Sequence, residues 1–160
     1  MRMTEAPLHA APSLIKPPAG PVRLRNRWRD NQFIHLEHEA LEVGAIEPGW
    51  HSAHWSLQAV EDSPFVVIRN ALHAHHFLQM RDSGLTCGLL LGPGQLLDRF
   101  PVSPSPASQG AHWYIERIKG TTFVRFRNRW RHDCYINCEG GSLEATPVGD
   151  AFQSAHWECL

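Results

Sequence analysis

Apolar and polar residues alternate with a period of two along VRLRNRWR at 22–29. This alternation predicts a β-strand with one buried face. The dipeptide Asp30-Asn31 is a turn signal, and a second alternating stretch follows at 33–37. After further alternation, the segment AHWSL at 53–57 closes the unit. The pattern therefore predicts four short strands within this first part of the chain.

The same pattern returns 102 residues later. Residues 22–58 align with 124–160 without a gap, and 15 of the 37 positions are identical. A more divergent copy begins at 66, at an offset of 44, and its closing segment GAHW at 110–113 arrives late because of an insertion. The chain therefore consists of a copy, a copy with an insertion, and a third copy. The expected boundaries are about 22–60, 65–116 and 122–160.

Three four-stranded units predict an all-β domain, because no single unit can bury its apolar face alone. Each copy ends in a tryptophan, at Trp55, Trp113 and Trp157. We therefore expect a β-trefoil over residues 22–160, made of three pseudo-symmetric four-stranded repeats. Residues 1–21 are expected to form a flexible N-terminal arm. The insertion at about 89–110 ends rich in Pro and Ser and is expected to be a surface loop.

Composition places the chain among ordinary globular proteins, with 160 residues, 42% hydrophobic and 19% charged. The formal charge is −1, so no overall field favours nucleic acid as a partner. No apolar run approaches the length that spans a bilayer, which argues against membrane insertion. The N-terminal sequence lacks the pattern of a secretory signal. We therefore expect a cytoplasmic protein, with export by a non-classical route as the alternative.

Neither cysteine nor histidine predicts a metal site. The four cysteines are expected to be free, buried or half-buried thiols, because a reducing compartment disfavours disulfides. The eleven histidines show no spacing that would bring three or four zinc ligands together. His54, His112 and His156 occur once per copy and are expected to face outward and apart. No nucleophile motif or phosphate loop occurs, so we expect no cofactor and no enzymatic activity.

Three motifs of the repeats resemble the ricin-type (Q-x-W) lectin family over about residues 22–160. They are an I/L-x-N opening, an apolar–polar–apolar triplet in the second strand, and a small residue two positions before the last tryptophan. The resemblance implies carbohydrate binding, with glycans or glycoconjugates as partners. In that family an aspartate at the middle of the triplet bonds the sugar, and an aromatic ring in the next loop stacks on it.

Two positions of the family pattern differ here, the aspartate at the triplet centre and the glutamine before x-Trp. The triplet centres are His35, Gln79 and Asn137, and the family's glutamine before x-Trp is Ala53, Ala111 or Ala155. Trp50 and Phe152 supply loop aromatics in copies one and three, so two shallow sites are expected there. The expected ligand-binding residues are His35, Trp50, Ser52, Gln79, Asn137, Phe152 and Ser154. The alternative is that the triplet centres are polar residues on a solvent face and that the aromatics cap the barrel.

Other recurring residues allow further readings. Arginines at 23, 25, 27 and 29 recur at 125, 127, 129 and 131, and residues two apart share one side of a strand. Such rows could bind a sulfated or phosphorylated polymer. They could equally form a solvated face paired with glutamates at 37, 39, 42, 139 and 144. A third possibility is a protein-interaction or inhibitor trefoil that acts through the 89–110 loop.

Two sets of recurring residues are expected to be structural. Trp28 and Trp130 share the parity of the apolar positions and are expected in the core. Asn26, Asn70 and Asn128 recur at the same place in each copy. We expect each to be a buried amide that bridges a hairpin backbone.

Overall fold

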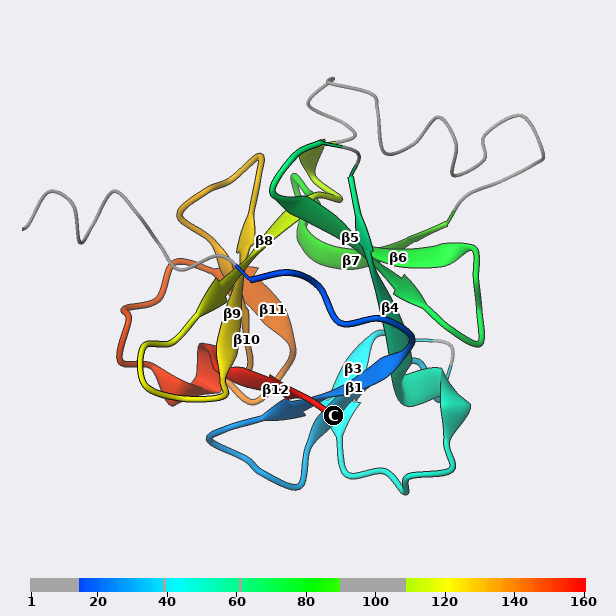
Figure 1. The fold of residues 1–160 in the computed structure, drawn as a ribbon. Coiled ribbons are helices and arrows are strands. Elements are labelled where there is room, and N and C mark those ends of the chain that lie inside the picture. The colour runs from blue at the N-terminus through cyan, green and yellow to red at the C-terminus, as the bar shows by residue number, and fades with distance from the viewer. Residues whose placement is uncertain (1–14, 39, 61, 90–108) are drawn as a thin grey trace, which may run out of the picture.

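The computed structural model describes residues 15–38, 40–60, 62–89 and 109–160, and of Leu89 only the backbone. Within these ranges the chain forms twelve β-strands, four in each repeat (Figure 1). The strands are β1 (Val22–Asn26), β2 (Phe33–His35), β3 (Glu42–Gly44), β4 (His54–Ala59), β5 (Phe65–Asn70), β6 (His76–Arg81), β7 (Gly84–Leu89), β8 (Trp113–Arg117), β9 (Val124–Asn128), β10 (Tyr135–Asn137), β11 (Glu144–Thr146) and β12 (Trp157–Cys159).

Six of these strands close into a barrel. Hydrogen-bonded antiparallel pairs run from β1 to β4, β5, β8, β9, β12 and back to β1. The remaining strands form the hairpins β2–β3, β6–β7 and β10–β11, each attached to the first strand of its repeat. Figure 1 shows the repeats as three lobes around one axis. A closed barrel with three such hairpins is the β-trefoil expected from the repeats.

The three closing tryptophans fill the core. Trp55, Trp113 and Trp157 are fully buried. Each indole N–H donates to a carbonyl of the second strand of its own repeat. The acceptors are the carbonyl oxygens of Ile34 at 2.8 Å, Leu78 at 3.1 Å and Ile136 at 2.9 Å. The tryptophan recurs because each third of the barrel must fill the same volume and attach its hairpin in the same way.

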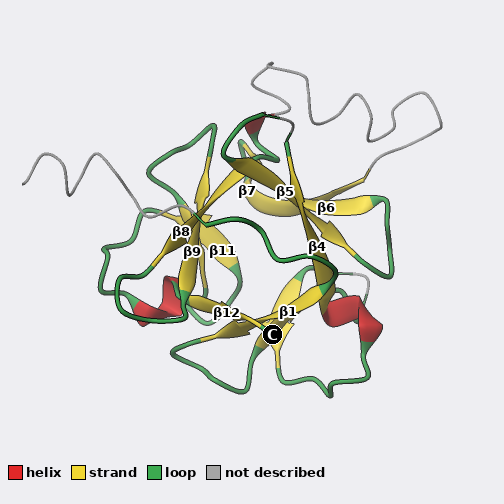
Figure 2. Ribbon diagram, in the orientation of Figure 1, coloured by secondary structure: helices red, strands yellow, loops and turns green. Residues whose placement is uncertain are grey.

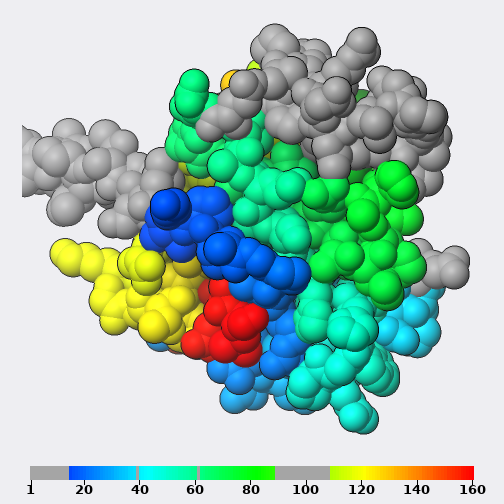
Figure 3. Space-filling model, turned by 45° about the vertical axis from the view of Figure 1, so that its right-hand side comes forward, coloured from blue at the N-terminus to red at the C-terminus, as the bar shows by residue number. Residues whose placement is uncertain are grey.

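Part of the expected N-terminal arm packs against the barrel. The Ile15 side chain contacts the core, and its N–H donates to the Ile115 carbonyl at 3.3 Å. Figure 3 shows the first described residues (blue) beside the C-terminal strand (red). The expectation of a flexible arm therefore does not extend to Ile15, whose apolar side chain gains contacts with the core. Residues 1–14 and 90–108, which include most of the insertion loop, lie outside the described residues.

All four cysteines are free thiols, as expected, with Cys134 and Cys138 buried and Cys87 and Cys159 half-buried. Burial raises the pKa of Cys87 to about 12 and that of Cys134 and Cys159 to about 11. Thiol reagents attack through the thiolate. We therefore expect the native protein to react slowly with a chromogenic disulfide reagent at pH 8, and all four thiols to react once it is unfolded in guanidinium. Rapid titration of the native thiols would contradict this burial.

Candidate functional site

A short helical turn presents an aromatic ring in repeats 1 and 3. The turns are η1 (His51–Ala53) and η4 (Gln153–Ala155), drawn red in Figure 2. Trp50 and Phe152 precede them with nearly the same backbone angles, φ −81° and ψ 103° against φ −74° and ψ 101°. Their side chains are 39% and 44% exposed. Both loop aromatics therefore face solvent rather than cap the barrel.

Each turn is held by two repeats at once. The Ser52 carbonyl accepts from the Leu36 N–H at 3.1 Å and from the Asn70 side-chain amide at 2.9 Å. The Ser154 carbonyl accepts from the Cys138 N–H at 3.1 Å and from the Asn26 amide at 2.9 Å. The aromatic residue two positions earlier is therefore attached to a fixed backbone, which lowers the entropy lost on binding.

The recurring asparagines also fix the neighbouring hairpins, as the sequence predicts. In each repeat the Oδ1 atom accepts the N–H groups of residues two and three positions later, at 2.8–3.0 Å. The Nδ2 atom donates to the preceding repeat in ring order. Asn26, Asn70 and Asn128 are all buried. Each amide thus joins its own hairpin to the turn of another repeat.

The triplet centres His35 and Asn137 do not face solvent, which corrects the expectation. They are 5% and 0% exposed. Alternation places both opposite the core, but their side chains lie against the third strand of their own repeat, His35 at Gly44 on β3 and Asn137 at Thr146 on β11. Gln79 is half-buried on β6. Both hydrogens of the Asn137 amide are used, by the Tyr135 carbonyl and the Thr146 hydroxyl, each at 2.9 Å.

His35 and Asn137 instead support the residue two positions later. The Glu37 N–H donates to His35 Nδ1 at 3.1 Å, and the Glu139 N–H donates to Asn137 Oδ1 at 3.0 Å. Burial lowers the pKa of His35, and His38 lowers it further. Glu42 and Glu37 raise it, but by less than burial lowers it. The imidazole is therefore neutral near pH 7, with its proton on Nε2. Gly44 lies opposite, where a Cβ would come within 3.1 Å of that nitrogen.

Sequence reasoning did not select Glu37 and Glu139 as site residues. Both are exposed, and each follows the end of the second strand of its repeat. Their identity in the two copies that also carry the loop aromatics is the signal that could have found them. The Ser52 hydroxyl donates to Glu37 at 2.6 Å, whereas the buried Ser154 hydroxyl has no partner among the described residues. Both serines are buried and do not face solvent.

Trp28 is not in the core, which is a second correction. It is 46% exposed, and Trp130 is half-buried against the core edge. The strand parity ends at Asn26, because its side chain accepts the N–H groups of Trp28 and Arg29 and turns the chain. Trp28 thereby projects from the hairpin that joins β1 and β2.

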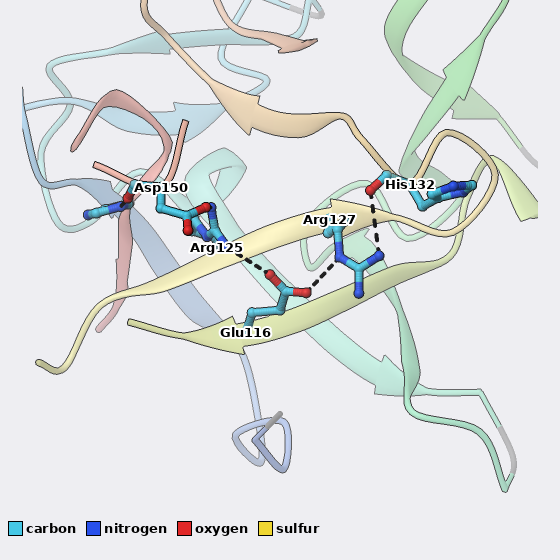
Figure 4. A network of polar contacts seen from close by, with 6 residues as sticks. Glu116, Arg125, Arg127, His132 and Asp150 are labelled. Carbon is cyan, nitrogen blue, oxygen red and sulfur yellow. Dashed lines mark hydrogen bonds and ion pairs between the residues drawn. The ribbon is translucent and has the colours of Figure 1, made fainter. Parts of the chain in front are cut away.

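The arginine rows are largely occupied by partners within the protein. Buried Glu116 pairs with Arg125 at 3.2 Å and with Arg127 at 2.6 Å, and Arg125 also pairs with Asp150 at 2.9 Å (Figure 4). Arg25 pairs with Glu158. Seven arginines also lie over aromatic rings, at 4.2–4.5 Å from the ring centre; they are Arg23, Arg27, Arg29, Arg125, Arg127, Arg129 and Arg131. The carboxylates that pair are therefore not the glutamates the sequence suggested; Glu39 lies outside the described residues.

Two of the recurring histidines are buried rather than outward, which is a third correction. His112 and His156 are 0% and 3% exposed, while His54 is half-buried. His156 donates through Nε2 to the Asp150 carbonyl at 3.0 Å and accepts from Arg27 at Nδ1 at 3.3 Å. His112 Nδ1 lies 3.0 Å from the Arg129 guanidinium. Arg27 and Arg129, each directly after the first strand of its repeat, contact these two histidines, which strand parity alone does not reveal.

No group of three or more potential metal ligands comes together among the described residues. Within the same part of the chain, no helix is long and apolar enough to cross a membrane.

No protein-family model matches the sequence. No curated protein matches it either. Similarity appears among solved structures. A GlcNAcα1-4Gal-releasing endo-β-galactosidase from Clostridium perfringens is 20% identical, with a TM-score of 0.68 over 89% of this chain and 32% of its own. The lectin SeviL bound to asialo-GM1 saccharide is 17% identical, with a TM-score of 0.65 over 88% of this chain and 96% of its own.

A third similar structure is the Polyporus squamosus lectin bound to Neu5Acα2-6Galβ1-4GlcNAc. It is 12% identical, with a TM-score of 0.61 over 88% of this chain and 48% of its own. The chain thus spans about a third of the endo-β-galactosidase, about half of the Polyporus lectin and nearly all of SeviL. At these identities the likeness concerns architecture. The chain has the β-trefoil fold.

Proposed function

We propose that this protein is a non-enzymatic carbohydrate-binding module with shallow sites in repeats 1 and 3. The observation that carries the proposal is the pair of exposed rings, Trp50 and Phe152, held in the same geometry by equivalent hydrogen bonds. An exposed ring on a fixed backbone suits stacking against the C–H face of a sugar. The structural similarity to SeviL and the Polyporus lectin supports the same class of function.

The polar partners of the sugar differ from the initial expectation. Asn137 is buried and both its amide hydrogens are bonded, so it cannot donate to a ligand. Glu37 and Glu139 are exposed, and their backbones are fixed by His35 and Asn137. We assign to these two carboxylates the role of accepting sugar hydroxyls. Single shallow sites of this kind bind at roughly millimolar to tens of micromolar, so two sites on one chain would add avidity.

The double variant Trp50→Ala, Phe152→Ala tests this proposal. We expect it to lose at least about tenfold in binding to neutral glycans immobilised on an array, because both stacking surfaces are removed. Each single variant should retain one site. Leu160→Ala is the matched control, since Leu160 is also exposed, at 45%, but follows β12 and belongs to neither turn. Full binding by the double variant would refute the site assignment.

Salt dependence separates this function from polymer binding by the arginines. Stacking on neutral sugars changes little with salt, whereas binding through several arginines weakens steeply. The ion pairs of Arg25, Arg125, Arg127 and Arg131 argue against the arginine rows as the main site. The proposed protein-interaction role of the 89–110 loop stays a prediction, because residues 90–108 lie outside the described residues.

A further inference from the structure

The site of repeat 3 borders the first hairpin of repeat 1. The Asn26 amide bonds the Ser154 carbonyl at 2.9 Å, and the Arg27 N–H bonds the His156 carbonyl at 2.9 Å. The next two residues, Trp28 and Arg29, project from this hairpin. Phe152 belongs to the same turn as Ser154. Two exposed aromatic residues from different repeats are therefore attached to one hydrogen-bonded junction.

Arg29 has no carboxylate partner among the described residues. Its guanidinium lies over the Trp28 ring, 4.5 Å from the ring centre. Burial raises the pKa of the Cys138 thiol, while the nearby Arg29 lowers it and Glu139 raises it. The geometric link is the Asn26 side chain, which accepts the Arg29 N–H at 2.9 Å and donates to the Ser154 carbonyl, so the Arg29 hairpin adjoins the repeat-3 turn.

The equivalent junction between repeats 3 and 2 contains a carboxylate. Arg131 lies over the Trp130 ring, also 4.5 Å from its centre, which matches the pair of Arg29 and Trp28. There the guanidinium contacts Asp82 at 3.4 Å. Asp82 comes two residues after Met80, which lies near the end of β6. The Met80 N–H donates to the Gly110 carbonyl. The protein thus shows how a carboxylate sits on this arginine–tryptophan pair.

Repeat 3 has glycine where repeat 2 has this aspartate. The Cys138 N–H donates to the Ser154 carbonyl, as the Met80 N–H donates to the Gly110 carbonyl, so Cys138 is the equivalent of Met80. Gly140 comes two residues after Cys138 and is therefore the equivalent of Asp82. The hairpins β6–β7 and β10–β11 also have the same length. Gln79 pairs with Thr86 in the first and Asn137 with Glu144 in the second, and both pairs are the same number of residues apart. Gly140 therefore supplies no carboxylate at the position from which Asp82 contacts Arg131 in repeat 2.

We propose that the repeat-3 site is a composite site for carboxylated sugars, in which Arg29 on Trp28 binds the sugar carboxylate and Phe152 stacks on the ring. This rests on the proposed carbohydrate-binding function and specifies the ligand class of one of its two sites. An arginine held flat on an aromatic ring presents its donors in the fork that matches a carboxylate.

Nearby carboxylates set the orientation of the ligand. Glu139 is exposed beside Gly140, and the Glu144 carboxylate lies 3.4 Å from where a Cβ at Gly140 would stand. Neither forms an ion pair with Arg29. In the proposed site they accept sugar hydroxyls and repel a ligand carboxylate that is turned away from Arg29.

The site of repeat 1 lacks this feature. The hairpin that borders it carries Leu72 and His73 where the other hairpins carry tryptophan and arginine. The Asn70 side chain fixes both of their N–H groups, as Asn26 does in repeat 1. His38 occupies the position of Asp82. The two sites are therefore chemically different, and repeat 1 is left with neutral sugars.

The test is an NMR titration of the intact chain that follows the Trp28 and Trp50 indole signals. The probes are methyl β-D-glucuronoside and the methyl α-glycoside of N-acetylneuraminic acid, each with its methyl ester, and methyl β-D-glucoside. We expect one of the acids to bind at Trp28 about fivefold more tightly than its ester, the size of a favourable exposed ion pair. The two acids distinguish a hexuronate from a sialic acid as the source of the carboxylate.

Substitutions at position 140 separate charge from size. Gly140→Asp should place a carboxylate on Arg29, as Asp82 does on Arg131, and abolish the preference for the acid. Gly140→Asn, of the same size, should keep it, and Arg29→Gln should lose it. Equal binding of acid and ester by the native chain, or no shift at Trp28 with either acid, would overturn the proposal.

The proposed function has its own readout in the same titration. In one outcome, methyl β-D-glucoside shifts the Trp50 indole signal while neither acid binds at Trp28 more tightly than its ester. That result would support the carbohydrate-binding function and overturn only the composite site. An acid preference that depends on Gly140, without any shift from the neutral glycoside, would support the composite site and contradict the neutral site in repeat 1.

Discussion

Replacing Trp157 with alanine is expected to destabilise the protein by about 3–5 kcal/mol. The side chain is fully buried, and its indole donates to the Ile136 carbonyl at 2.9 Å. Alanine would leave a large cavity and an unsatisfied buried carbonyl. Since a domain of this kind is stable by only about 5–15 kcal/mol, much of the folding free energy would be lost. Urea unfolding followed by far-UV circular dichroism measures the change.

Trp28→Ala is the matched control for this substitution. The sequence places both tryptophans in apolar register, but Trp28 is 46% exposed and its ring contacts Arg29. We expect a change within about 1 kcal/mol in the free energy of unfolding, as for an exposed residue with one cation–π contact. Similar losses in the two variants would mean that Trp28 is a core residue after all.

Replacing Glu116 with alanine is expected to cost about 3 kcal/mol. The Glu116 carboxylate lies between Arg125 and Arg127, whose side chains are themselves largely buried (Figure 4). Without it, two guanidinium groups would remain in a poorly solvated place. Asp150 would still face Arg125, but Arg127 would keep only the Tyr114 ring and a long contact with the His132 carbonyl. Denaturant unfolding at pH 7 measures the loss.

Asp82→Ala is the matched control, because it removes the carboxylate partner of an arginine at the surface. The Asp82 side chain is almost fully exposed, and its pair with Arg131 spans 3.4 Å. Exposed pairs contribute at most about 1 kcal/mol, so this variant should unfold nearly as the native protein does. If Glu116→Ala were equally mild, the buried network would contribute little to stability.

The fold could be predicted from the sequence because its repeats carry the evidence in triplicate. Trp55, Trp113 and Trp157 recur because each fills one third of the core. The three asparagines recur because each hairpin needs the same amide. One copy alone would have shown a strand and a turn. The comparison of three copies showed which residues the fold requires.

The errors concern the places where a strand ends. Parity placed Trp28 inside, but the Asn26 side chain turns the chain two residues earlier. Strand parity also placed His35 and Asn137 on the solvent side, but both are buried, with contacts to the third strand of their own repeat. The partners of the arginines could not be predicted, because Arg125 and Arg127 meet Glu116 across the boundary between two repeats. Contacts between repeats leave no periodic signal within one of them.

The barrel closes through its first and last strands. β1 and β12 are paired, and Arg23 and Leu160 exchange two backbone hydrogen bonds of 2.9 Å. During synthesis β1 therefore has an unpaired edge until the final strand of the fold leaves the ribosome. Open strand edges invite pairing with other chains, and such distant pairings form slowly. Loss of β12 would thus expose the edges of β1 and β9, and the nascent chain depends on this strand for protection against aggregation.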